Sequence, residues 1–566
     1  MPSENVFETD VLVIGGGIAG CFAAIKAKEQ GVDVILVDKG YVGRAGQTPY
    51  ARGYMAFNPE WGHDLDTWMS YISRTGEYVN NRDWTEITIK ESYARYLDLV
   101  AWGVTFQKGE DGEPVSRPMT EGGTVSLQFE GRNFPMIMRK QARKIGVKII
   151  DRIMIAELLK QDGRIVGSIG IPVESSELYI FNAKTTIMCV GACGFKPAGY
   201  PPLAQLTADG ESMAYRAGAE ITGKEFVDTH FTRVEDPSII GRMQAPRGRG
   251  DLVPDRERSG GAGGSPGGGP RRPPFANLFN SEGNKISDRP AGTSPYPFTY
   301  LQLEFEAHAG HGPMFSHYDS GDRYEMVGGA TLGMSVRKAE GIWPADSKCA
   351  SNVQGLYAAG DALGNMQNGT VYASGGGSLA GSAVTGTRAG VAAAAEAKQI
   401  EKPKIDEKEL SRAKNFVLAP MERKGGFSPR WATQILQNTL MPYFIMFIKK
   451  EDRMQAALTM VEFLRDHIMP KLFARDRHEL RLALETKNMV LNAEMRLRSS
   501  IFRTESRGNH YREDYPRRDD PGWLAWVKIK EEEGGMKLYK VPIPEKWWPD
   551  LSKPYEELYP FRLPNE

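Results

Sequence analysis

The chain has 566 residues, and at roughly 150 residues per domain this length predicts three to four structural units with a large buried core. Its 71 basic and 71 acidic side chains cancel, so no overall charge attracts it to nucleic acid or to an anionic membrane. A hydrophobic fraction of 41% and a charged fraction of 25% are those of an ordinary globular protein. A small binding module and a charge-driven nucleic-acid binder are therefore excluded.

The first forty residues have the pattern of a strand, a helix and a strand, at 10–14, 21–30 and 32–37. Gly15, Gly17 and Gly20 stand between the first strand and the helix, and Asp38 ends the second strand. In this context the glycines permit a tight turn, a close approach of a pyrophosphate to the backbone, and close helix–strand packing. The helix N-terminus can bind the phosphates, and Asp38 can bind a ribose. The unit is typical of dinucleotide binding.

Further elements are expected along the chain from hydrophobic periodicity. Strands are expected at 147–155, 165–171 and 185–190 and near Tyr324, and another short strand is expected to end in the segment 355–361. Helices are expected within 60–103, at 210–221, from about 375 to Lys398, and over 406–505. Residues 259–274 contain seven glycines and four prolines, a composition typical of irregular structure. The segment from Arg512 onward is rich in Pro, Trp and Tyr with little periodicity, so we expect an extended tail.

The predicted fold class is α/β, with a doubly wound nucleotide-binding domain, an inserted α+β cap domain, a helical domain and a tail. The predicted boundaries are 1–222 and 325–400 for the discontinuous nucleotide-binding domain, 223–324 for the cap, 405–510 for the helical domain, and 511–566 for the tail.

The cysteines are too few for a disulfide scaffold and wrongly spaced for an iron–sulfur cluster, whose thiolate ligands occur in tight runs. They are Cys21, Cys189, Cys193 and Cys349. We expect Cys189 and Cys193, which are four apart in an apolar stretch, to be small buried residues, and any cluster to be held by another chain. No signal peptide is visible, and the apolar run 440–448 is far shorter than the roughly 20 residues of a membrane span. A cytoplasmic protein without direct membrane insertion is therefore expected.

Several separated motifs together resemble the flavoprotein family of succinate dehydrogenase, fumarate reductase and adenylylsulfate reductase, with the adenylylsulfate reductase branch nearest in appearance. They are 15–20 with Asp38, 207–210, 355–361, 375–379 before an Ala-rich helix, and 503–516. The resemblance spans nearly the whole chain and implies an FAD-dependent oxidoreductase. The cofactor-binding residues it implies are Gly15, Gly17, Gly20, Asp38, Lys39, Gln47, Thr48, Gly191, Asp209, Asp361, Ser378 and Leu379.

Departures from the family pattern bear on cofactor attachment and substrate. The membrane-complex enzymes carry a flavin-linked histidine where this chain has Gln47, so the resemblance implies noncovalent FAD. An arginine proton donor is missing from 295–300, and a dicarboxylate-binding histidine and arginine are missing from 368–374. Without these groups a small dicarboxylate would leave desolvated, unpaired carboxylates. We therefore expect another small molecule, either organic or sulfur-containing.

Three residues are candidates for catalysis. His230 ends the family-like run Glu-Phe-x-x-x-His and can carry a proton near neutral pH, although a hydrogen-bonded core histidine is an equal alternative. Arg249 can bind an anionic substrate, although a solvated loop is the slightly favoured explanation, and Arg289 can replace one of the family's missing arginines. Three other histidines, His308, His311 and His317, are better explained as loop and strand residues than as metal ligands, so no metal site is predicted.

The expected function is that of a catalytic flavoprotein subunit, which exchanges electrons between a substrate at the flavin and a separate, ferredoxin-like iron–sulfur subunit. Two alternatives remain: a stand-alone flavin-dependent reductase or dehydrogenase acting on an activated alkene, and an electron-transfer scaffold without a substrate. Aromatic side chains in 520–566 suggest that the tail embraces the iron–sulfur partner, with packing on its own chain as an equal alternative.

Overall fold

The computed structural model describes residues 4–110, 112–118, 124–172, 177–196, 205–228, 232–233, 277–286, 305–317, 323–327, 334–335, 338–372, 375–560 and 562–566. A seven-stranded sheet runs in the order β6–β2–β1–β9–β8–β7, and β18 also pairs with β9. Its strands are β1 (Glu4–Ile14), β2 (Val34–Asp38), β6 (Lys148–Asp151), β7 (Ile153–Gln161), β8 (Arg164–Pro172), β9 (Leu178–Met188) and β18 (Leu356–Ala358). The pairs joining β6, β2, β1, β9 and β18 are parallel, whereas β9, β8 and β7 are antiparallel. The expected strands of the nucleotide-binding unit are confirmed.

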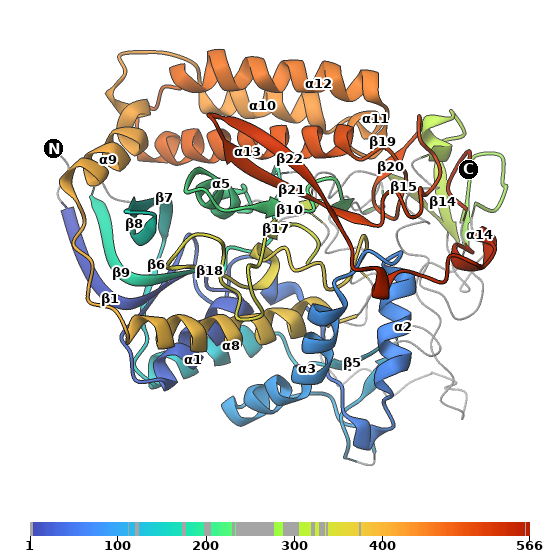
Figure 1. Cartoon of the computed structure of the whole chain (residues 1–566), viewed down its shortest axis with the longest axis horizontal. Coiled ribbons are helices and arrows are strands. Elements are labelled where there is room, and N and C mark those ends of the chain that lie inside the picture. Colours follow the sequence, from blue (N-terminus) through green and yellow to red (C-terminus); the bar gives the residue numbers. More distant parts are fainter. Residues whose placement is uncertain are drawn as a thin grey trace.

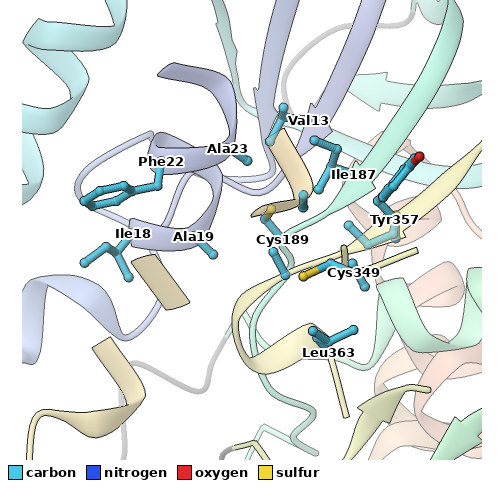
Figure 2. Packing of buried hydrophobic residues seen from close by; sticks show 14 of the residues in the cluster. Val13, Ile18, Ala19, Phe22, Ala23, Ile187, Cys189, Cys349, Tyr357 and Leu363 are labelled. Carbon is cyan, nitrogen blue, oxygen red and sulfur yellow. The ribbon is translucent and has the colours of Figure 1, made fainter. Parts of the chain in front are cut away.

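Two long helices pack side by side against this sheet, α1 (Ile18–Glu29) and α8 (Gly377–Ala397) (Figure 1). Their backbones meet closely because α8 has glycine at the crossing. A Cβ atom on Gly386 would lie 2.4 Å from the Ala19 carbonyl oxygen, and one on Gly390 would lie 2.4 Å from that of Ala23. Figure 2 shows Ala19, Phe22 and Ala23 with Ile187 of β9 in one packed cluster. The small-residue composition of both helices thus creates the core beneath the nucleotide-binding turn.

Other elements surround this core. Helices α2 (Leu65–Thr75), α3 (Arg82–Trp102) and α4 (Phe134–Lys144) accompany a small sheet of β3 (Gly53–Met55), β5 (Val125–Gln128) and β4 (Ser116–Pro118). The described part of the expected cap contains β12 (Thr232–Arg233), β15 (Arg323–Val327), β14 (Met314–His317) and β13 (Asn277–Phe279), paired in that order. A separate short ladder joins β11 (Val227–Asp228) to β16 (Met334–Ser335).

The helices of the C-terminal region lie along one side of the molecule (Figure 1). They are α9 (Glu407–Glu422), α10 (Pro429–Leu440), α11 (Tyr443–Met446), α12 (Glu451–Phe463) and α13 (Arg477–Phe502). Two short strands, β19 (Ile448–Lys449) and β20 (Tyr511–Arg512), pair beside them. Helix α13 lies next to α5 (Asp209–Arg216), which brings the C-terminal helices against the central sheet region.

Three predictions of secondary structure are wrong. The strand expected at 147–155 is divided at Arg152 (φ +62°) into β6, which pairs with β2, and β7, which pairs with β8. The helix expected at 210–221 ends at Arg216, because Gly218 takes a left-handed conformation (φ +96°) before strand β10 (Ile221–Thr222) begins. The tail is not simply extended, since β21 (Ala525–Glu532) and β22 (Gly535–Pro542) form a hairpin. This hairpin joins β10 and β17 (Gly341–Ile342) in a four-stranded sheet, and a short helix α14 (Tyr555–Leu558) follows.

The tail aromatics mostly pack on their own chain. Trp523, Trp526, Trp547 and Tyr559 are all less than 10% exposed. Trp526 also donates a hydrogen bond from its indole N–H to the Val79 carbonyl oxygen. The hypothesis that exposed aromatic side chains of the tail bind a partner is therefore not supported, because these rings already pack in a core.

None of the helices in the described part of the chain has the length and hydropathy of a membrane-spanning segment.

Candidate functional site

The turn between β1 and α1 uses its three glycines differently. A Cβ atom on Gly20 would lie 1.8 Å from the Gly15 carbonyl oxygen, and one on Gly15 would lie 2.3 Å from that of Cys189. A Cβ atom on Gly17 would meet only the Thr48 Oγ1 atom, at 3.2 Å. Gly15 and Gly20 are therefore required by packing within the protein, whereas the space beside Gly17 belongs to a cavity that the turn borders.

The cavity lies at the carboxyl ends of β1, β2 and β9, where open α/β sheets bind ligands. Its empty volume is about 1070 Å³, counting the part that opens to solvent. Nine of the predicted cofactor-binding residues line it: Gly15, Gly17, Asp38, Lys39, Gln47, Thr48, Gly191, Asp209 and Asp361. The fold thus brings segments that are far apart in the sequence together around one cavity.

Asp38 is buried, and both of its carboxylate oxygens accept backbone hydrogen bonds. Oδ2 accepts from the Gly16 N–H at 2.6 Å, and Oδ1 accepts from the Gly40 N–H at 2.7 Å. Burial raises the pKa of Asp38, and these two N–H groups act in the opposite direction. A carboxylate has about four lone-pair sites, so Asp38 can also accept from a hydroxyl in the cavity. Its first role, which the sequence did not show, is to fix the glycine turn.

Thr48 completes the helix terminus, because its hydroxyl accepts a hydrogen bond from the Ile18 N–H at 3.1 Å. This contact satisfies one donor of the first turn of α1 and leaves the side chain on the cavity wall. Gln47 and Gly191 also line the cavity, Gly191 in a left-handed conformation (φ +78°).

Lys39 lines the cavity, but its ammonium is engaged by the protein. It donates to the Thr207 Oγ1 atom at 2.9 Å, to Asp209 Oδ2 at 2.7 Å and to Glu485 Oε1 at 3.0 Å. An ammonium has three donors, and each has a partner here. Lys39 therefore supports the cavity wall, and a direct bond from its ammonium to a cofactor would need one of these contacts to break. The Asp209 Oδ1 atom accepts from the Asn488 amide at 2.9 Å.

The far wall contains Asp361, whose Oδ1 atom accepts from the Ser378 hydroxyl at 3.0 Å and pairs with the Lys338 ammonium at 3.2 Å. Lys338 also donates to Ser382, which lines the cavity, at 2.8 Å. Burial lowers the pKa of Lys338, and Asp361 opposes that shift. Lys338 was not identified from the sequence, because a lone lysine carries no local signal of burial.

Three predicted residues do not line the cavity. Gly20 packs on Gly15, Ser378 positions Asp361, and Leu379 packs against the hydrophobic core. The candidate catalytic residues His230, Arg249 and Arg289 lie outside the described residues. Among the described residues, the cavity lining contains no histidine.

A buried ion network adjoins the cavity. Glu211 accepts from the Lys224 ammonium at 2.5 Å, and Lys224 also pairs with Glu340 at 3.0 Å. Arg496 pairs with Glu340 at 2.7 Å. Within the described chain, Cys193, Glu211 and Glu340 are the one group close enough to hold a metal ion. Lys224 and Arg496 together balance the charges of Glu211 and Glu340, so the network is explained without a metal.

All four cysteines are buried and free, and the burial of Cys189 and Cys193 was predicted. Burial raises the pKa of Cys193 to about 12, so its thiol stays protonated at neutral pH. Burial likewise raises the pKa of Cys189, Cys349 and Cys21. Thiols in this state are poor metal ligands and poor nucleophiles.

Comparisons with known proteins agree with this geometry. Residues 10–258 match a family model described as an FAD binding domain, and residues 433–552 match one described as the C-terminal part of the fumarate reductase flavoprotein. A subunit of the fumarate reductase (CoM/CoB) from Methanothermobacter marburgensis is 27% identical over 94% of this chain and 98% of its own length. The fumarate reductase flavoprotein subunit of Mycobacterium tuberculosis is 27% identical over 96% and 99%.

Two solved structures show the same fold. Adenylylsulfate reductase of Archaeoglobus fulgidus superposes with a TM-score of 0.77 at 21% identity, over 96% of this chain and 97% of that chain. A quinol fumarate reductase chain of E. coli superposes with a TM-score of 0.80 at 17% identity, over 95% and 97%.

A dinucleotide-binding sheet, a cavity at its carboxyl edge and these matches define an oxidoreductase that uses FAD. Two family models, over residues 10–258 and 433–552, and relatives of 27% identity make this chain similar to the flavoprotein family of succinate dehydrogenase and fumarate reductase, as the sequence motifs indicated.

Proposed function

We propose that this chain is the catalytic flavoprotein subunit of an oxidoreductase complex, and that its FAD exchanges electrons between a small-molecule substrate and an iron–sulfur subunit. Two observations together support the proposal. The chain has a cavity for FAD, and its four cysteines are all buried in its own core. No cysteine of the chain can ligate a cluster without leaving that core, so cluster chemistry needs a second chain.

The relatives support a second chain, because those of Methanothermobacter marburgensis and Mycobacterium tuberculosis are both named as subunits. The nature of that chain comes from the family resemblance and from the lack of cluster ligands here. FAD, when bound, supplies two-electron or one-electron exchange, which amino-acid side chains cannot provide.

The residues around the cavity have distinct roles in the proposal. The N-terminus of α1 beside Gly17 binds the pyrophosphate, Asp38 and Asp361 accept hydrogen bonds from cofactor hydroxyls, and Thr48 fixes the helix terminus. We propose that FAD is bound without a covalent link. Gln47 stands where related enzymes carry a linking histidine, and the cavity-lining Cys189 and Cys193 are held protonated by burial.

We further propose that His230 carries a proton on the substrate side, and that Arg249 and Arg289 bind an anionic substrate group. These residues lie outside the described part of the chain, so the proposal rests on residue chemistry and on the family resemblance. A small dicarboxylate is disfavoured, because the family's histidine and arginine anchors are missing from 368–374.

The proposal is tested by isolating the tagged chain anaerobically from its native host. FAD, non-haem iron and acid-labile sulfide should elute together with a second polypeptide. Recovery of a chain that contains FAD, turns over a substrate and has no iron would favour a stand-alone reductase instead.

A further inference from the structure

Helix α13 has an unusual polar face, because that face is turned toward the interior. Glu485, Asn488 and Asn492 follow one another at the spacing of a single helix face, and none is more than 2% exposed. In an ordinary surface helix such residues would face water. Here each of them forms a hydrogen bond with a side chain that lines the nucleotide cavity.

The three contacts form a row along the outside of the cavity wall. Glu485 Oε1 accepts from Lys39 at 3.0 Å, and the Asn488 amide donates to Asp209 at 2.9 Å. The Asn492 amide donates to Glu211 at 2.8 Å. The Asn492 Oδ1 atom also accepts from the thiol of Cys193, which is a fourth lining residue, at 3.0 Å.

Glu485 connects the largest number of segments. Its carboxylate accepts from Lys39 at the end of β2, from Lys196 in the segment after β9, and from Arg481 on its own helix at 2.9 Å. Two of the three cations thus come from the chain segments that border the cavity. Burial acts to raise the pKa of Glu485, but the three cations outweigh it and hold that pKa at about 2.

From this row of contacts we propose that the polar face of α13 holds the wall of the FAD cavity in its binding geometry. Glu485 and Asn488 are the positioning residues, and they act through Lys39 and Asp209. The inference rests on the assignment of this cavity to FAD. Its consequence is reciprocal: the docked helix stabilises the cavity in its binding geometry, and bound FAD stabilises the docked helix.

The test compares three variants by FAD affinity of the apoprotein. Glu485→Gln removes the shared anion, and Asn488→Ala removes the contact with Asp209 at a smaller structural cost. Glu494→Gln is the matched control, because Glu494 lies on the same helix, is 3% exposed and pairs with Arg465 and Arg498 away from the cavity. Thermal unfolding of each apoprotein measures the general loss of stability separately.

We expect the dissociation constant for FAD to rise at least tenfold in Glu485→Gln and at least threefold in Asn488→Ala, and to stay within twofold of wild type in Glu494→Gln. The visible circular dichroism of bound flavin should change in the first two variants only, a signal that a merely structural role would not move. FAD should also slow amide hydrogen exchange in 481–496 more than in 451–463.

Wild-type FAD affinity and flavin spectra in both Glu485→Gln and Asn488→Ala would overturn the inference while leaving the proposed function intact. An equal loss of affinity in Glu494→Gln would also overturn it, since the effect would then be general destabilisation. A wild-type protein that binds no FAD would instead refute the proposed function itself.

Discussion

Replacing Gly17 by alanine should weaken cofactor binding while leaving the stability of the apoprotein nearly unchanged. Gly17 has φ −71°, which alanine adopts without strain, and the nearest atom to the added Cβ is Thr48 Oγ1 at 3.2 Å. Where the backbone conformation suits alanine, replacing glycine by alanine stabilises a protein by about 0.4–1 kcal/mol, because it lowers the conformational entropy of the unfolded chain. The tight contact with Thr48 opposes this gain, so the apoprotein should stay within about 1 kcal/mol of wild type.

The same methyl group should weaken FAD binding, because it enters the cavity where the backbone meets the pyrophosphate. Forcing an extra methyl group into a close-packed contact costs about 1–3 kcal/mol. At about 1.4 kcal/mol per tenfold in affinity, the dissociation constant should rise roughly 5- to 150-fold. Titration of apoprotein with FAD, followed by flavin fluorescence, measures this change.

Gly20→Ala is the control, because its Cβ would lie 1.8 Å from the Gly15 carbonyl oxygen. That backbone oxygen cannot move aside easily, so this variant should lose stability with or without FAD. Unchanged FAD affinity in Gly17→Ala would refute the placement of the pyrophosphate at α1. A loss of apoprotein stability in Gly17→Ala as large as in Gly20→Ala would refute the division of roles among the glycines.

Three further predictions concern pH, substrate and the tail. The pKa of Glu485 in the folded protein lies below its ordinary value, so the ionised carboxylate stabilises the fold above about pH 4.5, and this stabilisation is lost as pH falls toward 2. The difference in melting temperature between wild type and Glu485→Gln should therefore narrow between pH 6 and pH 2.5. A difference that stays constant would show that it does not come from the charge of Glu485. Turnover assays with succinate and fumarate should show little activity, whereas rates of roughly 10 per second or more would show that other groups replace the missing anchors. Trp526→Ala should lower the free energy of unfolding by about 3–5 kcal/mol in urea titration, because it empties a site in the core between the hairpin and Val79; an unchanged stability would contradict that packing.

The nucleotide-binding unit could be predicted from the sequence because its signals are local. The apolar run that became β1, the glycines at 15, 17 and 20, and the acid at 38 each restrict the backbone over a few residues. The family resemblance added the distant segments around Asp209 and Asp361, which the structure brings to the same cavity.

The role of α13 could not be predicted in this way. Its polar residues repeat at helical spacing, and that pattern is the same whether the face meets water or a buried cavity wall. Only the packing of α13 against α5 decides between the two, and this contact joins residues more than 250 positions apart, such as Asp209 and Asn488.

The hairpin of the tail, by contrast, did have a local signal. Val527 and Ile529 alternate with Lys528 and Lys530, and a pair of glycines at 534–535 follows before alternation resumes. This is the pattern of two strands joined by a tight turn. The abundance of prolines nearby obscured it, although the prolines lie outside the paired strands except for Pro542 at the end of β22.

Noncovalent binding of FAD is tested by acid precipitation of the purified wild-type protein, followed by measurement of FAD in the supernatant and in the pellet. If hydrogen bonds and packing alone hold the cofactor, as proposed, we expect about one FAD per chain, released entirely into the supernatant. Flavin that stays with the precipitated polypeptide, or a purified protein that contains no flavin and takes up none, would contradict the proposal.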